Sequence, residues 1–152
     1  MWHHIIRLGL TRLFYPCLMI FGTIGNALCL KILLRKQFRR QSTCQYLCIL
    51  AVIDIVFIYT RSIRFLYRYI SHDDLRNKSL WICRTFIFFS STLTHLASWI
   101  LVIVSFDRYF LIKNLLPRRH VGLRVVYSTC LLILIVSLVN LHYFFIIGKT
   151  VC

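Results

Sequence analysis

The chain has 152 residues, 59% of them hydrophobic, and its mean hydropathy of +0.75 excludes an ordinary soluble domain. It carries 19 Lys and Arg against four Asp and Glu, a formal net charge of +15. These basic residues gather between long apolar blocks and do not line a polar domain, so the composition favours a membrane protein over a nucleic-acid binder.

Four apolar blocks are each long enough to cross a bilayer, which takes about 20 residues of helix. Because lipid offers the backbone no hydrogen-bond partner, each block is predicted to be helical. No repeat and no linker rich in Pro, Gly or Ser separates the blocks, so we predict an all-α membrane protein that forms one compact bundle. The predicted spans cover about residues 13–35, 46–70, 82–112 and 125–147.

The first two loops indicate how the chain is oriented. Four basic residues fall within the six positions 35–40, a density typical of a cytoplasmic loop. Asn77 begins the sequon Asn-Lys-Ser, a candidate glycosylation site that places the second loop outside. The first 12 residues are too short for a cleaved signal peptide, so the first span is expected to insert the chain with its amino terminus extracellular.

Two polar residues interrupt the first two spans. Asp54 lies within the second span, where a carboxylate is costly and normally faces the interior of a bundle. Asn26 on the first span and Asp54 are equally far along the chain from Arg40, at the centre of the connecting loop. We therefore expect them at one depth, with the Asn26 amide donating to the carboxylate and Gly25 allowing close helix approach. The alternative is an Asp54 that packs without this partner.

The third span begins near Cys83 and ends near Arg108, 25 residues later. At 1.5 Å per residue this is about 37 Å of helix, enough to place the two residues at opposite interfaces. Cys152 follows the fourth span and is expected on the same side as Cys83. A disulfide between Cys83 and Cys152 fits this geometry in an oxidising compartment, and two free thiols are the alternative.

Four short motifs occur in order along the chain, each on a different part of the predicted helices. They are Gly25-Asn26 on the first span, Leu50–Asp54 on the second, Trp81-Ile82-Cys83 at the start of the third, and Asp107-Arg108-Tyr109 at its end. Together they resemble the motifs of the rhodopsin-like (class A) G-protein-coupled receptors. The resemblance runs through the whole chain but covers only the first four of that family's seven helices.

The resemblance implies a signalling function and not an enzyme. In that family the acid of the Asp107-Arg108-Tyr109 triplet pairs with its neighbouring arginine and holds the receptor inactive, and activation releases the arginine toward a heterotrimeric G protein. The family also implies the plasma membrane and an extracellular ligand. Since three helices of the family are not represented, we expect an amino-terminal fragment that does not couple to a G protein alone.

Other positions bear on the ligand. The resemblance places Ala97 where many family members carry a sodium-coordinating serine, which argues against sodium binding at Asp54. We expect no metal site and no cofactor. Ser90 stands where amine receptors carry an acid, which argues against an amine ligand. Arg64 and Arg68 share a helix face with Arg61. We assign Arg64, Arg68, Ser90 and Thr94 to a ligand vestibule that would attract an acidic ligand, such as a peptide; contact with lipid head groups is the alternative for the arginines.

Two other classes of protein remain open at this point. A four-helix transporter or channel subunit could use Asp54 on an ion path, although no inverted repeat or interrupted helix indicates one. An intramembrane enzyme would need more than His95 and Ser98, which are three residues apart and have no third group to orient them.

Overall fold

Four α-helices make up the fold of this chain. The computed structural model describes residues 2–38, 40–71, 74, 79–113, 121–142 and 144–145, with side chains of the first helix from residue 14 onward. The helices are α1 (Trp2–Leu33), α2 (Ser42–Ser71), α3 (Leu80–Ile112) and α4 (Val121–His142). Each contains a stretch long and apolar enough to cross a membrane, which confirms the predicted all-α class with four spans.

Several helix boundaries differ from the predicted ones, and α2 begins at Ser42, four residues before its predicted start at residue 46. Helix α1 begins at Trp2, well before residue 13, because hydropathy marks the apolar core of a bilayer and not the end of a helix. Helix α4 covers Val121–His142 in place of 125–147, so it starts one turn earlier and includes Arg124. The predicted end of this span at residue 147 lies outside the described residues.

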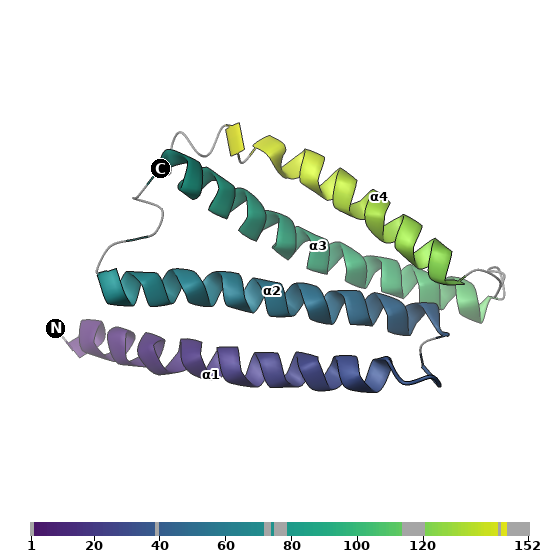
Figure 1. The fold of residues 1–152 in the computed structure, drawn as a ribbon, viewed down its shortest axis with the longest axis horizontal. Helices are drawn as coiled ribbons and strands as arrows, with labels where there is room; N and C mark the ends of the chain where they lie inside the picture. Colours follow the sequence, from purple (N-terminus) through teal and green to yellow (C-terminus); the bar gives the residue numbers. More distant parts are fainter. Residues whose placement is uncertain are drawn as a thin grey trace.

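The helices pack as a row of antiparallel neighbours (Figure 1). Helix α2 contacts α1 on one side and α3 on the other, while α4 packs on α3 and also reaches α2. A buried apolar cluster lies where α2, α3 and α4 meet, and it includes Ile53, Leu96, Ile100 and Val125. Helix α3 supplies most of this cluster, and α2 is the helix that contacts all three others.

Two contacts fix the register of α1 against α2. A Cβ built on Gly22 would lie 2.6 Å from Cδ1 of Ile58, so the helices approach closely there. Nearer the amino terminus, the rings of Tyr15 and Phe65 stack with centroids 4.5 Å apart. In both pairs the two residues are equally far from Arg40 along the chain, which agrees with the register predicted from Asn26 and Asp54.

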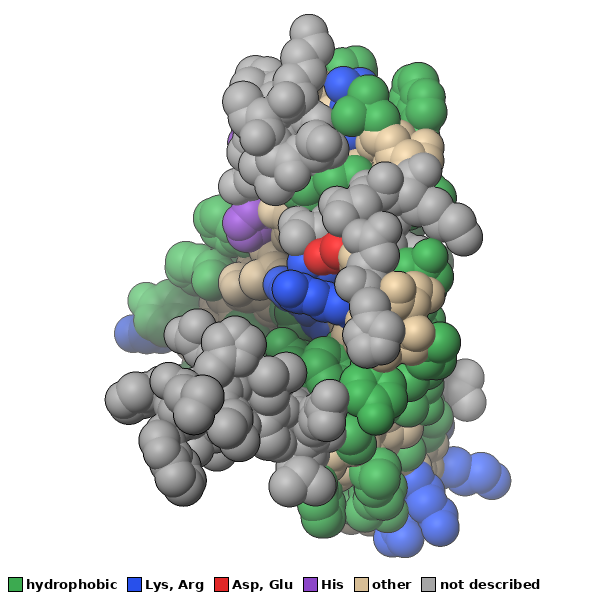
Figure 2. Space-filling model, turned by 90° about the vertical axis from the view of Figure 1, so that its left-hand side faces the viewer, with side chains coloured by type: hydrophobic (Ala, Val, Ile, Leu, Met, Phe, Trp, Pro, Cys, Tyr) green, Lys and Arg blue, Asp and Glu red, His purple; other side chains and the backbone are tan. Residues whose placement is uncertain are grey.

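Large apolar side chains lie exposed along all four helices, as expected where lipid is the solvent. Examples are Phe21 on α1, Ile63 on α2 and Leu138 on α4, each more than half exposed. Figure 2 shows hydrophobic side chains over much of one end of the bundle and a basic cluster along one edge. The surface therefore suits a bilayer and not water.

Candidate functional site

The carboxylate of Asp107 is buried where the first turn of α2 meets the last turns of α3. Its Oδ2 accepts hydrogen bonds from the hydroxyls of Ser42 at 2.5 Å and Thr43 at 3.2 Å. All three residues are less than a tenth exposed. The amino terminus of a helix also carries a partial positive charge, which favours an anion at this position. The contact ties the end of α3 to the start of α2.

Arg108 and Tyr109 point away from this contact and are exposed. Within the part of the chain that the structure describes, Arg108 forms no ion pair, so the predicted pairing of Asp107 with its neighbouring arginine is not formed here. The Asp107 carboxylate is instead occupied by the hydroxyls of Ser42 and Thr43. The acid faces α2, and the arginine faces the surroundings.

Ser42 and Thr43 were not predicted as site residues, although the sequence contains a signal for them. Thr43 and Asp107 are equally far from residue 75, in the loop between α2 and α3. Equal distance from the centre of the connecting loop therefore places Thr43 level with Asp107, as it places Asn26 level with Asp54. At the same end of the bundle, the hydroxyl of buried Tyr46 lies 2.5 Å from that of Ser128, which links α2 to α4.

Asn26 and Asp54 do not form the predicted hydrogen bond. The Asn26 amide donates to the carbonyl oxygen of Gly22 in its own helix at 3.0 Å, and among the described residues Asp54 has no hydrogen-bond partner. The depth of α1 relative to α2 was predicted correctly, but the rotation of α1 about its own axis was not. The predicted close-approach residue, Gly25, faces open space, and Gly22 packs against Ile58 in its place.

A polar cluster that the sequence reasoning missed joins α3 to α4. Asn140 is 1% exposed, and its Oδ1 accepts a hydrogen bond from Ser91 at 3.0 Å and lies 2.8 Å from Nδ1 of His95. Its amide donates to the carbonyl oxygen of Val136. Ser98, considered above as a partner of His95, donates instead to the carbonyl oxygen of Thr94. The signal was a lone Asn inside an apolar, uncharged span.

At the opposite end of the bundle, Arg64 is already paired. Its guanidinium makes two hydrogen bonds with the Asp74 carboxylate, at 2.8 and 3.2 Å, and lies over the Phe86 ring of α3. Figure 2 shows an acidic side chain beside basic ones at this end. Arg61 lies over the Phe57 ring of its own helix, and Arg68 is exposed. Arg68 is thus more accessible to a ligand than Arg64.

The remaining predicted positions divide into buried, exposed and undescribed ones. Ser90 is buried in the stripe of α3 that packs against its neighbours, whereas Thr94 is exposed and donates to the carbonyl oxygen of Ser90. Cys83 is fully buried and disulfide-bonded. Its predicted partner Cys152 and the predicted glycosylation site Asn77 lie outside the described residues. The pairing of Cys83 with Cys152 therefore stays a prediction.

Comparison with known proteins gives two matches. The model of the 7 transmembrane receptor (rhodopsin family) matches residues 25–152. A curated relative, the galanin receptor type 2 of Rattus norvegicus, is 33% identical over 111 residues, which cover 73% of this chain and 29% of the receptor. The chain thus spans less than a third of the length of this relative. No solved structure matches the chain.

Proposed function

The chain belongs to the rhodopsin family of seven-transmembrane receptors, and on that premise we propose that it transmits the binding of an extracellular ligand to a heterotrimeric G protein through Asp107, Arg108 and Tyr109. Proteins of this family are receptors and not enzymes. The observation that carries the proposal is the buried Asp107 carboxylate, held by the hydroxyls of Ser42 and Thr43 beside an exposed Arg108.

In the proposed switch, the two hydroxyls and the Arg108 guanidinium compete for the same carboxylate. While Ser42 and Thr43 hold Asp107, the five N–H donors of Arg108 are free to bind a partner at the end of α3. When α2 withdraws these hydroxyls, Asp107 becomes available to the arginine. The hydroxyl-bound arrangement is therefore the one proposed to favour coupling, and the contact between α2 and α3 is the element that sets the balance.

The test uses a chimera in which residues 1–152 replace the aligned part of the rat galanin receptor type 2, with G-protein nucleotide exchange as the readout. Ser42→Ala with Thr43→Val is expected to lower ligand-stimulated exchange about tenfold, since each bond to a charged group contributes about 1.5 kcal/mol or more. Asp107→Asn is expected to raise basal exchange, because an amide no longer attracts Arg108. Arg108→Ala is expected to abolish exchange.

Thr60→Val is the matched control, because the Thr60 hydroxyl also lies on α2 but donates only to the carbonyl oxygen of Val56. It should leave exchange unchanged. If the double variant instead raises basal exchange as Asp107→Asn does, the hydroxyls stabilise the inactive arrangement and the proposed direction of the switch is wrong. Full exchange in Arg108→Ala would remove the triplet from the mechanism.

For the ligand, we infer a peptide with an acidic group. The relative is by name a receptor for galanin, and two arginines of α2, Arg61 and Arg68, are exposed. Arg68→Glu in the chimera is expected to weaken peptide binding at least tenfold, through repulsion in place of attraction. Arg35→Glu is the control, because Arg35 lies just after α1 at the opposite end of the bundle. It should have no effect on binding.

Arg64 needs a different test because it is bound to Asp74. Arg64→Glu would place two acids together and disturb the loop, so a loss of binding in that variant does not by itself indicate ligand contact. The exchange of both residues, Arg64→Asp with Asp74→Arg, restores the ion pair with its charges reversed. If binding returns in the double variant, Arg64 supports the loop; if it stays lost, Arg64 contacts the ligand.

A further inference from the structure

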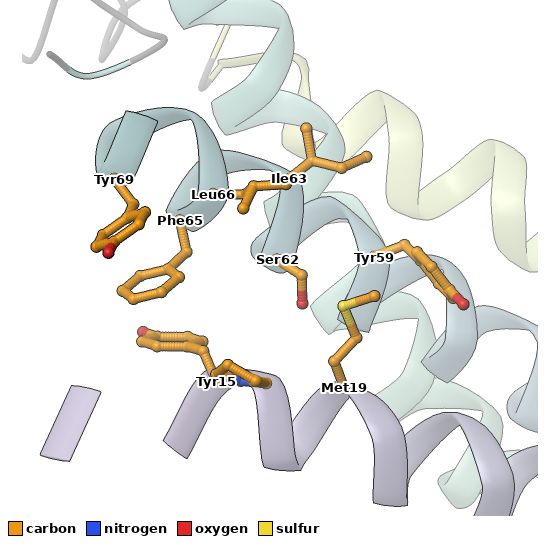
Figure 3. A pocket seen from close by; sticks show the side chains of 9 residues that line it. Tyr15, Met19, Tyr59, Ser62, Ile63, Phe65, Leu66 and Tyr69 are labelled. Atoms are coloured by element: carbon orange, nitrogen blue, oxygen red, sulfur yellow. The ribbon is translucent and has the colours of Figure 1, made fainter. Parts of the chain in front are cut away.

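Much of the lipid-facing surface can bind lipid only through apolar contact. A cavity of about 390 Å³ between α1 and α2 is an example, with Tyr15, Met19 and Leu66 in its walls (Figure 3). None of the described residues that line it is charged, so it has no group that would select a lipid by its headgroup. A guanidinium near the start of α3 is different, because a cation can bind the phosphate of a headgroup.

One face of α3 is directed toward α4. Its residues follow the spacing of a helical stripe, and they are Trp81, Arg84, Phe88, Ser91 and His95. Ser91 and His95 both contact Asn140 of α4. Helix α4 ends two residues after Asn140, at His142, whereas Arg84 lies seven residues before Ser91 on the antiparallel helix. Arg84 therefore lies more than one helical turn past the end of α4.

The Arg84 side chain lies among aromatic rings. Its guanidinium is 6.0 Å from the centroid of the Trp81 ring. The ring of Phe144, just after α4, lies against the rings of Trp81 and Phe88, with centroids 6.0 and 6.3 Å apart. The Nε of Arg84 is buried without a hydrogen-bond partner, and among the described residues Arg84 forms no ion pair. Because a buried donor on a charged group is costly when it is unpaired, an oxyanion beside this guanidinium would be stabilising.

The acids of the chain do not supply that oxyanion in the part that the structure describes. Asp107 lies at the other end of α3, Asp54 lies well inside α2, and Asp74 is bonded to a different arginine. The remaining acid, Asp73, lies outside the described residues. Residues 146–152, which follow Phe144 and Phe145 in the sequence, contain no acid at all. An anion from outside the chain is thus the partner that the site favours.

The depth of Arg84 indicates the source of this anion. Arg84 is the last charged residue before the uncharged stretch 85–106, so its guanidinium lies at the edge of the membrane, level with the phospholipid phosphates. Trp81 is 65% exposed one turn further out, at the interface where tryptophan is common. The bilayer supplies phosphate at all times, whereas an acidic peptide would neutralise Arg84 only while it is bound. We therefore favour the lipid.

We propose that Arg84, Trp81 and Phe144 bind the phosphocholine headgroup of a phospholipid. The Nε–H and one Nη–H of Arg84 lie along one edge of the guanidinium, where two phosphate oxygens can accept from them together. Aromatic faces bind quaternary ammonium groups, so the choline lies against the rings of Trp81 and Phe144. The short ethylene linker between phosphate and choline suits the single helical turn from Arg84 to Trp81. Phe88, one turn deeper in the membrane, lies beside the start of the lipid tails.

The test is native mass spectrometry of the whole chain, released from nanodiscs that contain equal amounts of three phospholipids with identical tails. They are phosphatidylcholine, phosphatidylethanolamine and phosphatidylglycerol, which share the phosphate but carry a quaternary ammonium, a primary ammonium and no cation. We expect the chain to retain phosphatidylcholine several-fold more than either of the others, because only its headgroup uses both the arginine and the aromatic rings.

Two variants separate the two halves of the headgroup. Arg84→Gln should lower the retention of phosphatidylcholine about tenfold, as expected for the loss of a charge-assisted hydrogen bond. Trp81→Ala should lower it about two- to fivefold and leave the retention of phosphatidylglycerol unchanged, since only the choline uses the ring.

Each variant has a matched control. Arg35→Gln removes the same charge just after α1, at the opposite end of the bundle. Trp99→Ala removes a tryptophan of α3 that is 53% exposed and lies 15 residues from Arg84. Neither control should change the preference for phosphatidylcholine.

Several results would overturn the proposal. Equal retention of the three lipids would remove headgroup recognition, and a preference for phosphatidylglycerol would leave only attraction by charge. Unchanged retention in Arg84→Gln would place the lipid elsewhere, and increased retention in Asp73→Asn would make Asp73 the partner of Arg84. The comparison of lipids uses the unaltered chain, so it decides the question even if a variant fails to fold. No receptor ligand and no G protein are present, so failure here leaves the proposed signalling function untouched, and the reverse also holds.

Discussion

A single buried carboxylate shows how much one residue depends on the helix opposite it. Asp107 receives both of its hydrogen bonds from the first turn of α2, so its stability in the bundle is set by Ser42 and Thr43. A donor to a charged group contributes about 1.5–3 kcal/mol. The residue that follows Asp107 in the sequence contributes nothing to this contact, because it faces another direction.

We therefore predict that Ser42→Ala lowers the free energy of unfolding by about 1.5–3 kcal/mol, the value of a hydrogen bond to a charged group. The measurement is unfolding by SDS in mixed micelles. Ser105→Ala is the control, because the Ser105 hydroxyl is exposed and donates only to the carbonyl oxygen of Leu101 in its own helix. Equal losses in both variants would show that the Ser42 bond to Asp107 adds no stability.

The glycines of α1 give a second prediction at this scale. Gly22→Val should destabilise the bundle by about 1–3 kcal/mol, the usual cost of overpacking, because its new atoms meet the side chain of Ile58. Gly25→Val makes the same chemical change three residues away, where no atom lies within 4 Å of an added Cβ, and should cost little. Ile58→Ala should rescue Gly22→Val. Without that rescue, the contact does not explain the loss.

At the scale of the helices, the sequence predicts the elements and their levels well, and their rotations poorly. All four spans follow from hydropathy because a bilayer fixes both the length and the composition of a helix. The level of α1 against α2 follows from the connecting loop, since the two helices start from the same turn. Rotation about the helix axis depends on side-chain packing, which is why Gly22 packs against α2 and Gly25 does not.

The residues of the candidate site were likewise predictable only where a single segment of the sequence indicates their role. Asp107 was predicted because the motif around it resembles a known family, but its partners Ser42 and Thr43 come from a different helix and belong to no quoted motif. Asn140 was missed because α4 has few polar landmarks that fix its rotation against α3. A residue is thus predictable when one segment determines its role, and unpredictable when the role arises where two helices meet.

Asn140 provides the prediction at the scale of the helices. Asn140→Leu should weaken the packing of α4 on α3 by about 1 kcal/mol, since hydrogen bonds between membrane helices average about 0.6 kcal/mol and this one residue accepts from two side chains of α3. Asn26→Leu is a matched control, because both amides donate to a carbonyl oxygen of their own helix but only Asn140 also bonds to another helix. Distances between spin labels on α3 and α4 would report the change. Equal broadening of the distribution of α3–α4 distances in both variants would assign the effect to the lost hydrogen bond between the amide and its own helix.

For the whole molecule, the length of α3 determines whether its two ends lie on opposite sides of the membrane. Leu80 and Tyr109, near its two ends, are exposed and 29 residues apart. At 1.5 Å per residue they are separated by about 43 Å, more than the 30 Å or so of the hydrocarbon core. The two positions must therefore lie on opposite sides of the membrane if α3 crosses it.

The corresponding experiment labels Leu80→Cys and Tyr109→Cys separately in intact cells with a membrane-impermeant maleimide, using the unaltered chain to measure background from its own thiols. With the amino terminus outside, Leu80→Cys should react in intact cells and Tyr109→Cys only after the membrane is opened. The opposite pattern would invert the predicted orientation and place the Ser42–Thr43–Asp107 contact outside the cell, away from any G protein. Reaction of both positions from one side would mean that α3 does not span the bilayer, and a switch at the end of α3 would then have no membrane to signal across.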